Sequence, residues 1–429
     1  MSAGPTFGEA FRFWLQLGFI SFGGPTGQIA IMHRELVERK KWISESRFLD
    51  ALNYCMLLPG PEAQQLATYS GWLLHGAKGG IVAGAFFVLP SVVILWALSW
   101  LYAAQGEVPW VAAAFAGLQP AVLAIVLSAT IRIGRKALRN AALWAVAALA
   151  FAALHFAHAP FPAVILGAGV LGLAGGRLAP SKFAAGKGRA NGAGKEANEP
   201  SPPARPSWRR ASIVAVLCLS LWWAPVAAVG LWRGTDDILF QEGIFFSKAA
   251  VVTFGGAYAV LPYVAQRAVE DHGWLDRGEM MDGLGMAETT PGPLIMVLAF
   301  VGFMGGWHDS GGLPPLLAAT LGLVLTTWVT FLPSFLFIFL GAPLIEKWRG
   351  VARLTATLTA ITAAVVGVIA NLAIWFGRHV LFPESGGVNL FAVVVAVVAF
   401  VGMERWKWDV VPVVLGSALA GVALRTLSG

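Results

Sequence analysis

Two Pro-Gly-Pro tripeptides interrupt apolar stretches of this 429-residue chain and are its first candidates for chemistry. They are Pro59-Gly60-Pro61 and Pro291-Gly292-Pro293, which lie 232 positions apart. Proline cannot continue a helix but suits its first turn, so the second proline of each tripeptide can open a new half-helix. The first N–H groups of such a half-helix carry partial positive charge and bind anions. Two half-helices facing each other would form a cradle for one compact anion.

Two Phe-Gly-Gly segments are further candidates. Ser21-Phe22-Gly23-Gly24 and Thr253-Phe254-Gly255-Gly256 each place a hydroxyl before two glycines. Glycine permits positive φ and a close approach of backbone N–H groups to a ligand. The alternative is that these glycines only let helices pack closely. Both interpretations stay open at this point.

Few polar side chains accompany these breaks. Lys248 lies inside an apolar stretch, where it either offers positive charge to an anion or snorkels to the membrane surface. The remaining candidate ligands are Gln28, Glu62, Gln65, Thr289 and Thr290. The candidate proton carriers, or partners in structural pairs, are Asp50, Glu62, Asp282 and Glu288.

Composition indicates an all-α polytopic membrane protein. The chain is 57% hydrophobic and 12% charged, whereas a soluble domain is about 25% charged. The net charge of +7 does not indicate nucleic-acid binding, because the basic residues fall between apolar runs. The two cysteines match no metal or disulfide pattern, and His155 and His158 lack carboxylate or cysteine partners nearby in sequence. We therefore expect no metal and no cofactor.

Hydropathy predicts about thirteen transmembrane segments. The predicted segments are 11–31, 48–75, 80–101, 111–131, 141–158, 161–177, 211–231, 243–263, 282–307, 314–340, 352–376, 388–403 and 409–427. Residues 179–210 are rich in Gly, Ala, Pro and charge and predict a flexible basic linker between an N-terminal repeat, 1–178, and a C-terminal repeat, 211–429. The distribution of Lys and Arg places the N-terminus and the linker in the cytoplasm and the C-terminus outside. Whether the PGP segments span or re-enter the membrane stays open.

The two halves are related in sequence. Residues 22–61 align without a gap with 254–293, and 11 of these 40 positions are identical. Ser44 and Asp276 follow equivalent tryptophans and are predicted helix N-caps. An odd number of predicted spans separates equivalent points, which inverts the second half. Inverted repeats with interrupted helices are typical of secondary transporters, whose sites lie near the midplane at the repeat interface.

These motifs resemble the chromate ion transporter family in its long, two-domain bacterial form. The resemblance rests on FISFGGP at 19–25, KKWI at 40–43, LLPGPEAQQLATYSGW at 57–72, TFGGAYAVLP at 253–262 and TTPGPL at 289–294. It implies export of chromate across the bacterial inner membrane, resistance to chromate, and sulfate as a chemically similar anion. The family's motif residues correspond to Phe22, Gly23, Gly24, Gln28, Trp42, Asp50, Pro59, Gly60, Pro61, Glu62 and Gln65. The second half departs from this pattern, because Leu294 stands where Glu62 stands in the first.

Several alternatives stay open. The transported anion is chromate, sulfate or another oxyanion, since sulfate and chromate share shape and charge. Membrane potential, proton coupling or both drive transport; no G-x-x-x-x-G-K-[ST] motif occurs. An integral-membrane enzyme or a structural scaffold is the alternative from another class. The expected partners are the anion and the lipid bilayer, and the existence of a homodimer stays open.

Overall fold

The computed structural model describes residues 4–22, 24–106, 108–183, 207–342, 352–383 and 386–428, and in these residues helices are joined by turns and short irregular segments, without strands. The predicted all-α fold is therefore confirmed. The helices before residue 184 are α1 (Phe7–Ile20), α2 (Gly24–His33), the π-helix η1 (Arg34–Arg39), α3 (Glu45–Cys55), α4 (Glu62–Gln105), α5 (Pro109–Ala137), α6 (Ala141–His155), α7 (Phe161–Leu178) and α8 (Pro180–Phe183).

The second half repeats this order after one additional helix, α9 (Trp208–Arg233). The following helices are α10 (Ile238–Val252), α11 (Ala257–Gln266), the π-helix η3 (Arg267–Asp271), α12 (Arg277–Thr289), the short 3-10 helix η4 (Leu294–Met296), α13 (Val297–His308), α14 (Pro315–Gly341), α16 (Ala352–Leu381), α17 (Leu390–Arg405) and α18 (Val410–Ser428). Of the predicted linker, the described ends belong to α8 and α9, and residues 184–206 lie outside the described residues.

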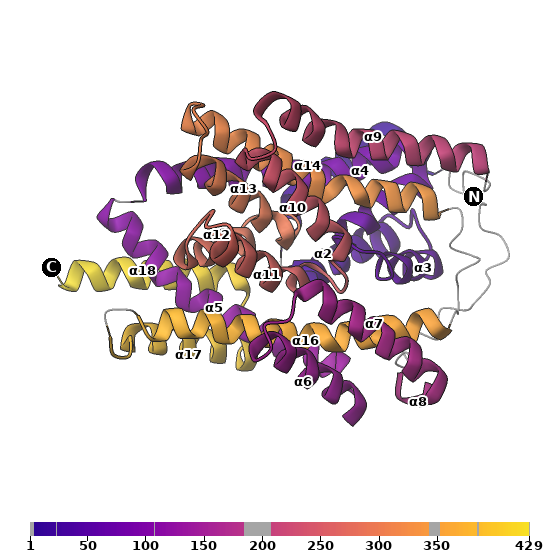
Figure 1. Ribbon diagram of the computed structural model, residues 1–429. Coiled ribbons are helices and arrows are strands. Elements are labelled where there is room, and N and C mark those ends of the chain that lie inside the picture. Colours follow the sequence, from indigo (N-terminus) through magenta and orange to yellow (C-terminus); the bar gives the residue numbers. More distant parts are fainter. Residues whose placement is uncertain are drawn as a thin grey trace.

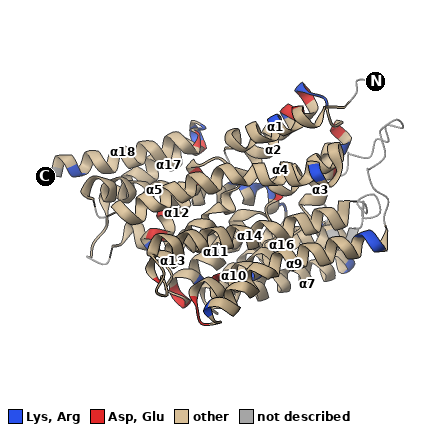
Figure 2. Ribbon diagram, turned by 90° about the horizontal axis from the view of Figure 1, so that it is seen from above, with Lys and Arg blue, Asp and Glu red and all other residues tan. Residues whose placement is uncertain are grey.

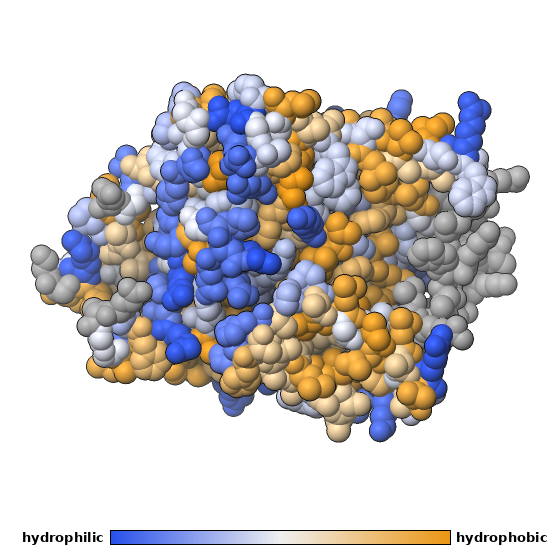
Figure 3. All heavy atoms as spheres, viewed as in Figure 1, coloured by the Kyte–Doolittle hydropathy of each residue, from blue (hydrophilic) through white to orange (hydrophobic). Residues whose placement is uncertain are grey.

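Length and composition identify a multi-pass membrane protein. Seven described helices are long and apolar enough to cross a bilayer, and two shorter apolar helices accompany them, so the predicted count of thirteen is not confirmed. Most of the ribbon between the helix ends is free of charge (Figure 2). Hydrophobic residues cover much of one face, beside a band of hydrophilic ones (Figure 3). Exposed Leu166 and Val170 on α7 illustrate an apolar surface that water would not stabilise.

The predicted spans around the glycine motifs are split rather than continuous. The segment 11–31 forms α1 and α2 on either side of the first FGG, and 48–75 forms α3 and the start of α4 on either side of PGP. The long helix α4 also contains a sharp turn, because His75 and Gly76 have non-helical dihedral angles and Gly71 packs against Gly79. The chain therefore reverses direction near residue 76, as α13 and α14 do in the second half.

Local structure repeats at the offset of 232. Ser44 caps α3 and Asp276 caps α12, which confirms both predicted N-caps. The tryptophans before them also have the same backbone partner. The N–H of Trp42 donates to the carbonyl of Leu36, and the N–H of Trp274 donates to that of Ala268, each at 2.8 Å. The repeat is therefore one of structure as well as of sequence.

The repeat continues beyond the PGP segments at shifted offsets. IRIGRKAL at 131–138 in α5 corresponds to IWFGRHVL at 374–381 in α16. Side-chain contacts correspond as well. His155 of α6 lies 2.9 Å from the amide oxygen of Asn371 in α16, and the equivalent Glu404 of α17 accepts from Ser128 of α5, also at 2.9 Å. Insertions in the loops thus shift the register without changing the packing.

The two halves interlock through their last helices. α5 packs against α17 and α18 of the second half, and α16 packs against α6 and α7 of the first. Glycines make both contacts possible: a methyl group on Gly421 would lie 2.7 Å from Cα of Gly117, and one on Gly172 would lie 2.9 Å from Cβ of Ala360. The N- and C-termini lie at opposite ends of the molecule (Figure 1).

This packing predicts that a larger side chain in α18 destabilises the protein at Gly421 but not at Gly416. Gly421→Val inserts a side chain between two helix backbones and should destabilise the protein by about 1–3 kcal/mol. Gly416→Val is the matched control, since nothing lies within 4 Å of a Cβ at Gly416. Thermal unfolding of both variants in detergent checks the difference, and equal melting temperatures would contradict the interlocked arrangement.

Candidate substrate site

The two PGP segments are each bonded to the FGG segment of the other half. The N–H of Gly60 donates to the carbonyl of Thr253 at 2.7 Å, and the N–H of Gly292 donates to the carbonyl of Ser21 at 2.8 Å. All four positions are related by the offset of 232. The four interrupted segments therefore meet in one junction between the halves, and two equivalent hydrogen bonds hold it together.

Both central glycines require glycine for a physical reason. Gly60 has φ of +116° and Gly292 has φ of +108°, a region that other residues rarely adopt. A methyl group on Gly60 would lie 3.1 Å from Oγ of Ser334, and one on Gly292 would lie 2.7 Å from Cβ of Ser91. Each glycine thus faces a serine of the long helix from the opposite half, and the junction leaves no room for a side chain.

Two glutamine side chains of the first half add hydrogen bonds to the junction, and the second half has no equivalent of them. Nε2 of Gln28 donates to the carbonyl of Gly292 at 2.5 Å and to that of Ser21 at 3.3 Å. Nε2 of Gln65 donates to the carbonyl of Pro59 at 2.7 Å. Both side chains are fully buried. Valine occupies the equivalent positions, 260 and 297, so the junction is symmetric in its backbone but not in its side chains.

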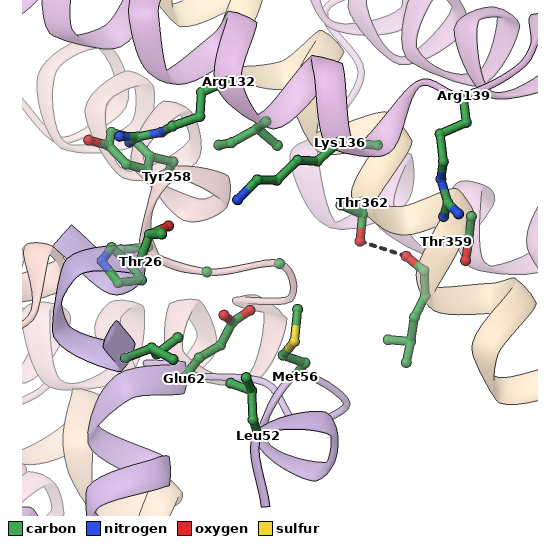
Figure 4. A pocket seen from close by; sticks show the side chains of 18 residues that line it. Thr26, Leu52, Met56, Glu62, Arg132, Lys136, Arg139, Tyr258, Thr359 and Thr362 are labelled. Carbon is green, nitrogen blue, oxygen red and sulfur yellow. Dashed lines mark hydrogen bonds between the residues drawn. The ribbon is translucent and has the colours of Figure 1, made fainter. Parts of the chain in front are cut away.

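A cavity of about 680 Å³ lies beside this junction (Figure 4). Its walls come from both halves: α2 and α3, the end of α5, the second FGG turn with α11, and the beginning of α16. The lining residues that offer polar groups or glycine backbone are Thr26, Glu62, Arg132, Lys136, Arg139, Gly255, Gly256, Tyr258, Thr359 and Thr362.

The charge in the cavity is positive. Arg132, Lys136 and Arg139 contribute three cations and Glu62 one anion, which leaves a net charge of +2 on the lining residues. The side chains of Lys136 and Glu62 point into the cavity from opposite walls, and Arg132 lies beside Tyr258 (Figure 4). Apolar walls around such a group of charges strengthen their field, since the local dielectric constant is below that of water.

These three cations are not among the residues that the sequence predicts for the site. Hydropathy ends the predicted span at 131 and so assigns residues 132–139 to a cytoplasmic loop, whereas α5 continues to Ala137. Arg132 and Lys136 have the spacing i and i+4, which places them on one face of α5, and Arg139 follows just after the helix ends. That periodicity was the available signal.

The second FGG turn and Glu62 are the predicted residues that line the cavity. Gly255 and Gly256 adopt φ of +87° and +89°, and a methyl group on Gly256 would lie 3.8 Å from Oε1 of Glu62. Pro61 caps α4, so Glu62 begins this helix as expected. In the second half, PGP leads into the 3-10 helix η4 before α13. The residues of both PGP segments are partly or fully buried and are absent from the cavity wall.

Other predicted residues lie apart from the cavity. Lys248 is exposed on α10. The hydroxyls of Ser21 and Thr253 donate to carbonyls one turn earlier in their own helices, each at 2.6 Å. Those of Thr289 and Thr290 likewise donate within α12. Phe22, Gly24 and Phe254 belong to the turns but not to the cavity wall, and Gly23 lies outside the described residues.

The predicted acidic residues have different surroundings in the two halves. Buried Asp282 of α12 accepts from the hydroxyl of Tyr102 at 3.0 Å and from Gln119 of α5 at 3.2 Å. Glu288 accepts from the hydroxyl of Tyr258 at 2.5 Å, so it lies directly behind the cavity wall. Asp50, equivalent to Asp282, is partly buried on α3.

Packing around these acids shows that the halves are in different arrangements. α12 packs along α5, whereas the equivalent α3 makes no comparable contact with α16. The cavity lies there instead, with Leu52 and Met56 of α3 on one wall and Thr359 and Thr362 of α16 on another. One of two equivalent clefts is therefore closed and the other is open.

The open cleft belongs to the end of the molecule that carries the N-terminus. The amide of Asn140, just after α5, donates to the carbonyl of Lys182 in α8 at 2.7 Å. The ring of His75, at the turn within α4, lies 3.0 Å from the carbonyl of Pro5. The end of α5 and the turn of α4 thus lie with α8 and the N-terminus, opposite the C-terminal end (Figure 1).

Comparison with known proteins identifies the family. The model of the family described as Chromate transporter matches residues 8–173 and 240–422. A chromate transport protein from Pseudomonas aeruginosa is 31% identical over 422 residues, which cover 96% of this chain and 91% of that protein. One from Cupriavidus metallidurans is 29% identical, covering 98% and 94%. A probable chromate transport protein from Synechococcus elongatus is 29% identical, covering 86% and 84%.

No solved structure matches the chain. The family model nevertheless covers both repeats with their FGG and PGP segments, and the relatives align over most of their length. The chain therefore belongs to the chromate transporter family.

Proposed function

We propose that this protein exports chromate from the cytoplasm through the cavity between its two repeats, and that it thereby confers resistance to chromate. The observation that carries the proposal is the net charge of +2 on the described cavity lining, where Arg132, Lys136 and Arg139 are opposed by Glu62. Relatives that align over nearly the whole chain bear the name chromate transport protein.

The chemistry of the cavity suits a tetrahedral dianion. Arginine and lysine supply charge-assisted hydrogen bonds to oxyanions, and Thr26, Thr359 and Thr362 offer hydroxyls. Gly255 and Gly256 of the second FGG turn contribute backbone to the cavity wall. A cavity of about 680 Å³ exceeds the volume of one such ion, so part of its hydration shell can enter with it. Binding that keeps some water is weak enough for release.

The proposed orientation places the N-terminus, the linker and the open cavity on the cytoplasmic side of the bacterial inner membrane and the C-terminus on the periplasmic side. An inside-negative potential then favours export, since each charge moved across 100 mV is worth about 2.3 kcal/mol. For a dianion this amounts to about 4.6 kcal/mol, or about three decades of concentration. Proton coupling is compatible with the same cavity, because Glu62 lines it and Glu288 lies behind Tyr258.

Flux measurements in proteoliposomes test this proposal. Chromate should leave a compartment that is negative inside, faster as the imposed potential rises, and a pH gradient at zero potential separates proton coupling from potential alone. Sulfate competition decides the selectivity: equal inhibition constants would make the protein a general oxyanion carrier. Absence of anion flux in folded, correctly inserted protein would overturn the transport function and restore the enzyme or scaffold alternative.

The cavity charge predicts a specific loss of affinity. Lys136→Gln should weaken the apparent affinity for chromate about 3- to 10-fold, which corresponds to roughly 1 kcal/mol, because it removes one cation from a partly hydrated site. Lys136→Arg should retain most of the affinity. Glu62→Gln should change affinity in the opposite direction, since it removes the anion.

Arg135→Gln is the control for this series. Arg135 lies on the same helix, outside the cavity wall, and pairs with Glu404 at 3.2 Å. Removing it takes away the same charge at another place, so chromate affinity should stay unchanged. Arg132→Gln and Arg139→Gln remove the other two cations of the cavity. If these two variants and Lys136→Gln all bound chromate with wild-type affinity, that result would contradict an anion site in this cavity.

The junction predicts that both central glycines are needed for transport. Gly60→Ala and Gly292→Ala should each lower the chromate flux at least about tenfold, because positive φ and a nearby serine both oppose a methyl group. Gly76→Ala is the control: its φ is +64° but nothing lies within 4 Å of a Cβ there. Chromate resistance of cells expressing equal amounts of each variant measures the effect, and resistance equal to that of Gly76→Ala would show that the junction is dispensable.

A further inference from the structure

Glu242 is a fully buried acidic residue that neither the cavity nor the junction uses. It lies in the second turn of α10, where its carboxyl group faces two glycines. A methyl group on Gly322 of α14 would lie 2.9 Å from Oε2, and one on Gly305 of α13 would overlap Oε1. Both carboxyl oxygens lack a hydrogen-bond partner among the described residues. The glycines thus leave room for the carboxyl group but donate no hydrogen bond to it.

Among the described residues around Glu242, none offers a positive charge that pairs with its carboxyl group. Within α13 and α14, the stretches 297–307 and 315–341 contain no titratable residue. Asp237, one turn before Glu242, has a charge of the same sign as a carboxylate at Glu242. The other titratable groups on the elements packed against α10, and on α10 itself, are Cys218, Arg233, Lys248, Tyr258, Tyr263, His272 and His308, together with Arg209 and Arg210 at the far end of α9.

The groups that could have balanced the charge of Glu242 either have other partners or are exposed. Arg233 donates to Asp237 at 2.8 Å and to the carbonyl of Gly311. Tyr258 donates to Glu288, and His308 lies 3.0 Å from the carbonyl of Trp274. Lys248 is exposed on the outer face of α10. An unpaired carboxylate in such a place costs several kcal/mol or more, so the carboxyl holds a proton while the three helices stay packed.

The position of Glu242 indicates from which end of the molecule this proton comes. Asp237 caps the beginning of α10, and its partner Arg233 reaches Gly311 in the turn between α13 and α14, at the end of the molecule away from the cavity. The equivalent residue in the first half is Ala10 of α1, which is buried where α1 packs against α4. The acidic residue therefore occurs once, in the half whose cleft is closed.

We propose that Glu242 is a proton-binding site, filled from the aqueous phase at the end opposite the cavity, whose occupancy controls the opening of that end. The inference rests on the proposed function, because opening there is what releases the anion. A proton joins the carboxylate when α10, α13 and α14 pack, and it returns to water when they separate and the carboxylate becomes hydrated. Because the proton binds the packed state more tightly, acid on that side favours the packed state by linkage.

The experiment measures chromate flux from proteoliposomes as the pH on the C-terminal side is varied at constant potential and constant pH on the other side. For the wild-type protein the flux should rise with pH, by at most about tenfold per pH unit, the limit for one proton. Glu242→Gln, which stays neutral, should lose this dependence. Asp236→Asn removes an exposed acid at the same end and should keep the wild-type profile.

A second measurement reads the proton directly. Infrared spectra of the purified protein at neutral pH should contain the C=O band of a protonated carboxyl group that is missing from Glu242→Gln. Glu242→Asp, which keeps a titratable carboxyl, should retain a shifted band and a pH-dependent flux, and it serves in place of Glu242→Gln if that variant does not fold.

The outcomes separate this inference from the proposed function. An unchanged pH profile in Glu242→Gln, or an unchanged band in both variants, overturns the proton site and leaves chromate transport intact. A wild-type protein that moves no chromate at any pH overturns the proposed function, and with it the control of opening, even if the band is present.

Discussion

The pair of hydrogen bonds from Gly60 to Thr253 and from Gly292 to Ser21 is the constraint on which the rest of the structure depends. A backbone group that ends a helix inside a membrane has no water to satisfy it, so interrupted helices persist there only if another segment supplies the partner. Each repeat supplies it for the other. The acceptor for the N–H of each central glycine, Gly60 or Gly292, comes from the other half, so the junction is complete only when the two halves associate.

The interlocked helices and the cavity follow from this association. α5 and α16 reach into the opposite half, so the walls beside the junction always combine residues from both repeats. Where α12 closes against α5, the two carboxylate oxygens of Asp282 accept hydrogen bonds from Tyr102 and Gln119. Where α3 does not close against α16, the same architecture leaves a cavity instead, and the end of α5 places its cations there. One scaffold thus shows two arrangements of equivalent elements, which is how an inverted repeat can expose a site to either side in turn.

Sequence reasoning predicted the features that depend on local chemistry. The helical class, the two breaks, the offset of 232 and the N-caps at Ser44 and Asp276 follow from periodicity, proline and glycine, and side chains that cap. It could not predict which break bonds to which turn, because that pairing is set by tertiary packing. Arg132 and Lys136 were missed because a charge lowers hydropathy even when its helix continues, and the orientation of Lys248 toward the outside was not readable from a short apolar helix.

The same correspondence between halves shows how the two clefts differ in the charge of their lining residues. The alignment of α5 with α16 pairs Arg132 with Trp375 and Lys136 with His379, and Leu294 stands at the position of Glu62. Trp375 already donates to Glu270 at 2.9 Å, so the counterpart surface offers neither of those α5 cations. The backbone hydrogen bonds of the junction are equivalent in the two halves, so the asymmetry that the sequence adds to the two clefts lies in side-chain charge.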